Sequence, residues 1–197
     1  MEWMPTGLAP SRAALLDERG RPDFRDVFGA LASRAVRIGT AVTRVRLSTV
    51  DLGAPELGGV ERFRVVLAEL NALRLDAEAR GLQADPARAA NVSLLRELLA
   101  SGRLEIRAAP LAGWAPDFTV FSGAAGPEAV VTGFHWFERP YPHRGPALNA
   151  VHLGDAARLA ARRHDELWEG AHDVGPAVWS ILSKAERRAS AVGASSG

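Results

Sequence analysis

Cysteine is absent from this 197-residue sequence, and lysine occurs once, at Lys184. Without cysteine the chain can form no disulfide, supply no thiolate nucleophile and build no zinc site that needs sulfur. Lysine and arginine together number 24, so arginine supplies the other 23 of them. Because Lys184 follows Ser183 rather than a glycine, the Gly-Lys-Ser/Thr phosphate loop of nucleotide-binding proteins is excluded as well.

Long apolar runs and strong net charge are also missing. No stretch approaches the roughly 18 consecutive apolar residues of a membrane-spanning helix. The first twenty residues contain Glu2, Asp17 and Glu18 and no apolar run of signal-peptide length. These features predict a soluble, cytoplasmic protein with no membrane partner. The net charge of +1 gives no field over the whole chain that would attract nucleic acid, so any basic surface must be local.

What the sequence does contain is enough apolar material for one domain. Hydrophobic residues make up 47% of the chain, and 197 residues is near the usual size of a single domain. We predict an irregular N-terminal arm over residues 1–21, one α/β domain over 22–189 and a disordered tail over 190–197. The tail prediction follows from its serine and glycine content.

Helical spacing and strand composition divide the domain further. The pattern predicts helices over 22–34, 86–101, 155–170 and 176–188, and strands over 36–45, 104–108, 117–121 and 129–133. Residues 61–67 are a further strand candidate, although apolar residues continuing to Leu75 would equally fit a helix. The fold class that follows is a three-layer α/β/α sandwich with a mixed sheet.

The order of elements in the second half has a parallel in a known family. From Leu94 onward the pattern gives helix, glycine turn, strand, loop, strand, glycine-rich turn, strand, a long irregular stretch and a helix that ends near Leu167-Trp168. This order resembles the second half of a phospholipase D-like domain. The resemblance covers roughly residues 35–172, and it implies a phospholipase D-like sandwich that often forms homodimers.

The resemblance also implies a catalytic His-x-Lys motif, which this sequence lacks. Aligned on the segments Trp114–Phe121 and Val131–Trp136, the family's histidine falls at Ala115, its lysine at Asp117 and its later aspartate at about Ser122. Neither His-x-Lys nor His-x-Arg occurs anywhere in the chain. That chemistry needs one histidine to attack phosphorus, a second to protonate the leaving oxygen, and lysines to neutralise charge. We therefore predict no catalytic residues, no metal and no cofactor.

Arginine pairs are the first binding candidates. Arg44 and Arg46, like Arg62 and Arg64, alternate along a strand candidate, so each pair shares one side of its strand. Arginine binds phosphates well because its guanidinium is planar and always charged. From Arg34 to Arg107 there are 12 arginines and 9 acidic residues, a net of +3, so salt-bridged edge residues are the alternative reading. Further members of such a patch would be Arg37, Arg103 and Arg107.

A polar stretch after the last predicted strand is the second candidate. His135 lies between two aromatic residues, and Arg139, His143 and Arg144 follow it within nine residues. These side chains could line a pocket in which an arginine binds an anion. A rigid surface loop whose aromatics cover the core is the alternative.

Histidine spacing raises a third candidate, a metal site. His164 and His172 are eight residues apart with Glu169 between them, so the three could lie on one side of a helix and hold zinc or manganese. The alternative is a solvated helix face. The sharper His-Glu-x-x-His arrangement is absent.

These observations predict a catalytically inactive phospholipase D-like domain that binds nucleic acid or a protein partner. Two alternatives remain open: a sensor of an anionic small ligand, and a phosphoesterase of unusual mechanism that pairs His135 with Asp117. The predicted binding residues are Arg44, Arg46, Arg62, Arg64, Asp117, His135, Arg139, His143 and Arg144.

Overall fold

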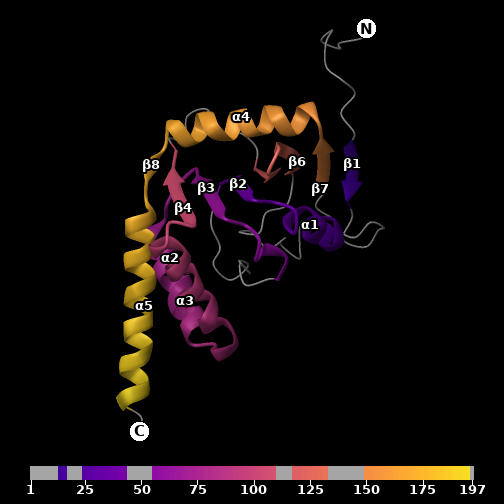
Figure 1. Ribbon diagram of the computed structural model, residues 1–197. Coiled ribbons are helices and arrows are strands. Elements are labelled where there is room, and N and C mark those ends of the chain that lie inside the picture. The colour runs from indigo at the N-terminus through magenta and orange to yellow at the C-terminus, as the bar shows by residue number, and fades with distance from the viewer. Residues whose placement is uncertain (1–12, 17–23, 44–54, 110–116, 133–148, 196–197) are drawn as a thin grey trace.

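The computed structural model describes residues 13–16, 24–43, 55–109, 117–132 and 149–195 (Figure 1). Within them one mixed sheet of eight strands runs in the order β1-β7-β6-β5-β2-β3-β4-β8. The strands β2, β3 and β4 are parallel to one another, and every other neighbouring pair is antiparallel. Their bounds are β1 Ala13–Leu16, β2 Arg37–Val42, β3 Arg62–Leu67, β4 Leu104–Ala108, β5 Phe118–Gly123, β6 Gly126–Thr132, β7 Asn149–Leu153 and β8 His172–Asp173.

Helices cover both faces of the sheet. The helix α4 lies along one face, and α1, α2, α3 and α5 lie on the other (Figure 1). Their bounds are α1 Phe24–Ala32, α2 Ala72–Gln83, α3 Pro86–Ala100, α4 Asp155–Glu169 and α5 Gly175–Ser195, with a short 3₁₀ turn, η2, at Pro55–Leu57. The predicted three-layer α/β/α sandwich with a mixed sheet is confirmed.

Alternation along the central strands decides which side chains face which layer. In β3, Phe63, Val65 and Leu67 enter the large core shared with the four-helix side. Between them, Arg64 and Val66 face α4. The large core therefore takes only apolar side chains from this strand, whereas the α4 side receives its arginines together with Val66.

Several sequence predictions are confirmed and others need correction. Residues 62–67 form a strand, so the helical alternative for that stretch is wrong, and α2 begins separately at Ala72. The arm is not irregular at Ala13–Leu16, because these residues pair with β7 at the sheet edge. The predicted tail is helical as far as Ser195. The strand β7 was not predicted at all.

None of the helices that the structure describes combines the length and the apolar character that crossing a bilayer requires.

Candidate functional site

Two arginines begin the neighbouring strands β2 and β3 on the side that faces α4. The register pairs Arg37 with Arg62 on neighbouring strands, so their backbones are about 4.8 Å apart, the usual strand spacing. Both are exposed, and the Arg62 side chain keeps 52% of its surface open. Arg103, one residue before β4, is also exposed and donates from its guanidinium to the Val60 carbonyl, 2.6 Å away. Three arginines thus gather where the parallel strands begin.

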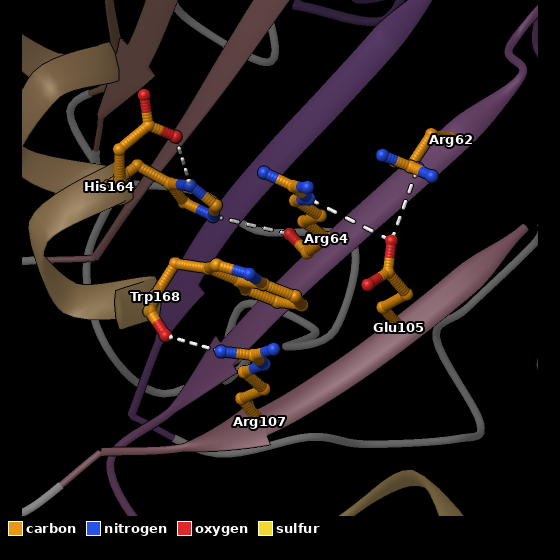
Figure 2. A network of polar contacts seen from close by, with 7 residues as sticks. Arg62, Arg64, Glu105, Arg107, His164 and Trp168 are labelled. Atoms are coloured by element: carbon orange, nitrogen blue, oxygen red, sulfur yellow. Dashed lines mark hydrogen bonds and ion pairs between the residues drawn. The ribbon is translucent and has the colours of Figure 1, made fainter. Parts of the chain in front are cut away.

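The next register row adds one cation and one anion. It runs from Gly39 through Arg64 to Glu105. The Glu105 Oε1 atom lies 3.1 Å from Arg62 Nε and 3.8 Å from Arg64 Nε (Figure 2). Neither Glu105 Oε1 nor Arg64 Nε has a hydrogen-bond partner, although both atoms are buried. Charge attraction, rather than a directed hydrogen bond, therefore holds this oxygen.

The charges on this face do not balance. Within β2, β3 and β4, all of which the structure describes, the α4 side carries four arginines and one glutamate. We call this surface the arginine face; it consists of Arg37, Arg62, Arg64, Glu105 and Arg107. The excess of three positive charges is concentrated on three neighbouring strands, so the local field is far stronger than the net charge of the chain suggests.

Trp168 of α4 packs against the inner end of the arginine face. The guanidinium carbons of Arg64 and Arg107 lie 4.9 Å and 4.4 Å from its ring centroid, which is cation–π geometry. Arg107 also donates to the Trp168 carbonyl, 3.0 Å away. In Figure 2, Arg107 lies below the indole ring, and Arg64 lies above it together with His164. The indole therefore fixes the inner two arginines.

His164, one turn before Trp168, is buried between α4 and the sheet. Its imidazole stacks on Trp168 at 6.1 Å with an interplanar angle of 16°, and meets Phe118 edge to face. The Nε2 atom lies 3.3 Å from the Arg64 carbonyl; because a carbonyl only accepts, Nε2 carries the proton in the neutral ring. Burial lowers the pKa of His164 below its ordinary value of 6.5, against the opposing effects of the Arg64 carbonyl and Asp165.

A small cavity of about 20 Å³ lies between α4 and the start of β2. Its polar lining comes from Arg37, Arg64, Ser122, His164 and Asp165. A cavity of this volume holds one water molecule and is too small for a metabolite. This part of the surface can therefore bind an anion only at its open, exposed side.

The flank of α4 adds two more arginines beside the same surface. Arg158, Arg162 and Asp165 are spaced i, i+4 and i+7, which places them on one side of the helix. Asp165 lines the cavity together with Arg37, so this flank is turned toward the arginine face. Arg158 pairs with Asp155 in the first turn of α4. Asp155 and Asp165 balance Arg158 and Arg162, so the excess positive charge stays on the strands.

The structure separates the predicted binding residues. It brings Arg62 and Arg64 together, but Asp117 lies just past the other end of β2, where its Oδ1 accepts hydrogen bonds from the Thr43 amide and hydroxyl, both at 2.8 Å. Arg37 and Thr43 are six residues apart along this extended segment, about 20 Å. Asp117 and the arginine face therefore do not share one groove. The remaining predicted residues lie outside those described: Arg44, Arg46, His135, Arg139, His143 and Arg144.

The histidine arrangement considered for a metal does not form. His164 is 3% exposed and faces the sheet, whereas His172 is exposed on the edge strand β8. The solvated helix face predicted for His164 is wrong, because the sheet-facing positions of α4 include Ala157, His164 and Trp168. In the part of the chain that the structure describes, no three His, Cys, Asp or Glu side chains converge on a metal position.

Glu105, His164 and Trp168 were not among the predicted site residues. A signal for Glu105 exists, since it alternates with Leu104 and Ile106 in a strand and so shares a side with Arg107. The signal for His164 is its spacing from Trp168 on the buried side of α4. Histidine is a polar residue that is often exposed, so its spacing from Trp168 alone does not predict that His164 is buried.

Comparison with known proteins finds a likeness among solved structures. No family model matches the sequence, and no curated protein matches it. Among solved structures, the chain is similar to a phospholipase D family member, Nuc from Salmonella typhimurium, with 12% identity, a TM-score of 0.49, and coverage of 83% of this chain and 98% of that one. Identity and TM-score at this level transfer no residue role, so the site rests on the geometry of this chain.

Proposed function

We propose that this chain is a non-catalytic, phospholipase D-like domain that binds nucleic acid through the arginine face. The proposal rests on the distribution of charge: four arginines and one glutamate share one side of three neighbouring strands. Arginines in such rows repel one another, and a polymer of phosphates supplies the opposing charge at several points at once.

The lack of catalytic groups supports a binding role over an enzymatic one. The sequence contains no His-x-Lys, and the position that the resemblance gives to the lysine is occupied by Asp117. The Asp117 carboxylate accepts two hydrogen bonds from Thr43 at the end of β2. This acid stabilises the strand end and supplies none of the positive charge that phosphoryl chemistry needs.

The surroundings of the arginine face favour contact with the phosphate backbone rather than with bases. Trp168 is 6% exposed, so it offers no surface for a base to stack on. Among the described side chains, the exposed large aromatic is Trp179 of α5, which lies on the opposite side of the sheet. Binding without base stacking or groove readout is independent of base sequence.

Fluorescence anisotropy with a fluorescein-labelled duplex of about 20 base pairs, and with one of its single strands, tests the proposal. Each phosphate contact contributes about −0.9 to the slope of log affinity against log salt, so four contacts predict an affinity loss of about 100-fold between 50 and 200 mM salt. Duplexes of different sequence should bind equally. Absence of binding to both probes at about 50 mM salt would refute the proposal.

A further inference from the structure

We propose that Glu105 takes the place of a backbone phosphate between Arg62 and Arg64, and that nucleic acid must displace it to bind. This inference rests on the proposed function and adds a regulating residue to the same surface. Glu105 is the carboxylate on the arginine face, and its Oε1 lies 3.1 Å from Arg62 Nε and 3.8 Å from Arg64 Nε.

The contact is well placed for charge but poorly satisfied in hydrogen bonding. Glu105 Oε1 and Arg64 Nε are buried atoms that lack hydrogen-bond partners. A phosphate carries oxygens in a tetrahedral arrangement and can accept hydrogen bonds from two guanidinium groups at once. Such a group could satisfy Arg64 Nε, the donor that the carboxylate leaves without a hydrogen bond.

The exchange needs no change in the core. The side chains of Arg62, Glu105 and Arg64 are 52%, 33% and 22% exposed, so all three reach solvent. Glu105 stands on β4 with its neighbours Leu104 and Ile106 buried on the other side, so the carboxylate can turn outward while the strand stays in place. The Arg62–Glu105 pair is partly exposed at the Arg62 side, and ion pairs that reach solvent contribute little to stability.

Competition by Glu105 would favour polymers over single phosphates. The carboxylate is tethered to the site, so a lone anion must compete with a group at high effective concentration. A nucleic acid can also engage Arg37 on the neighbouring strand, and the additional contact helps to offset the loss of the Glu105 pair. The arginine face would then bind a chain of phosphates and bind free phosphate only weakly.

The test compares Glu105→Gln with Glu97→Gln in the anisotropy assay. Both substitutions remove one negative charge, but Glu97 is exposed on α3, across the sheet from the arginine face. We expect Glu105→Gln to tighten binding of the labelled duplex by roughly three- to tenfold and Glu97→Gln by less than about twofold. Glu105→Thr, which introduces a residue that strands favour, serves as a second variant if the glutamine variant folds poorly.

A double-variant cycle separates displacement from general repulsion. If Glu105 acts through its ion pair with Arg62, then Glu105→Gln should tighten duplex binding by less than about twofold in an Arg62→Gln background. An undiminished effect in that background, or equal tightening by Glu97→Gln, would overturn the inference. The inference would also be overturned if the unaltered chain bound the duplex and neither Glu105→Gln nor Glu105→Thr bound it more tightly. Failure of the unaltered chain and of all variants to bind either probe would instead refute the proposed function itself.

Discussion

Gly39 and His164 meet where β2 passes beneath α4, and the imidazole fills the space that a side chain on residue 39 would enter. A Cβ built on Gly39 would lie 3.1 Å from both Cε1 and Nε2 of His164. Separations this short force the neighbour to shift. Trp168 stacks on one face of the ring and Phe118 also contacts it, so the room for such a shift is the cavity of about 20 Å³ that Gly39 and His164 both line.

The first prediction is that Gly39→Ala destabilises the fold. Overpacking beside a packed side chain costs about 1–3 kcal/mol, and because a small cavity adjoins the ring we expect a loss at the lower end of that range from urea denaturation. Gly59→Ala is the matched control, since a Cβ there meets nothing within 4 Å, and its effect should stay within about 0.5 kcal/mol. Equal stability of the two variants would show that the contact around residue 39 adapts.

The second prediction concerns acid. Burial lowers the pKa of His164, so below about pH 6.5 the unfolded chain binds a proton that the folded chain does not. Stability is therefore complete above the unfolded pKa and falls as the pH drops toward the folded pKa. Urea midpoints between about pH 7.5 and 5 should decline more steeply for the unaltered chain than for His164→Phe. Parallel declines would contradict the assignment of a buried neutral ring.

The third prediction tests the arginine face by charge removal. The double variant Arg37→Gln/Arg62→Gln should weaken duplex binding and reduce the salt slope by about 1.8, because two phosphate contacts are lost. Arg187→Gln, at an exposed position on α5 across the sheet, is the control and should change the slope little. A slope that stays constant in the double variant would show that nucleic acid binds elsewhere.

The fourth prediction is the absence of phosphodiesterase activity. With no His-x-Lys motif in the chain, purified protein should not cleave bis-p-nitrophenyl phosphate above the rate of buffer. Cleavage that disappears when the histidines are replaced one at a time would reveal a catalytic group of a different kind. The non-catalytic part of the proposed function would then be wrong.

Local patterns were sufficient to predict most of the elements. The segment of β2 carries a β-branched run, that of β4 a short apolar run between turns, and that of α3 the helix-start signal Asp85-Pro86, and these signals act over a few residues. The strand β7 was missed because Asn149–Leu153 is short and follows a stretch rich in proline. Its partner β1 was missed because four residues at a sheet edge carry almost no pattern of their own.

The site was predicted only in part because its geometry depends on register. Alternation showed that Arg62 and Arg64 share a side, but only the pairing of β2 with β3 and β4 places Arg37 and Glu105 beside them. Nothing in the order of residues shows that Asp117 lies at the far end of β2 from these side chains. Long-range register is fixed by packing of the whole sheet, which the sequence pattern does not specify.

The hydrogen bonds between Asp117 and Thr43 tie the end of β2 to the residue that precedes β5. Replacing Asp117 by lysine would introduce one residue of the motif that the resemblance implies, but it would also remove the acceptor of the Thr43 amide and hydroxyl. That variant would lose stability at the strand end and would still lack the histidine of the motif. Position 117 therefore serves as a clasp between two strands, and a cation there would open it.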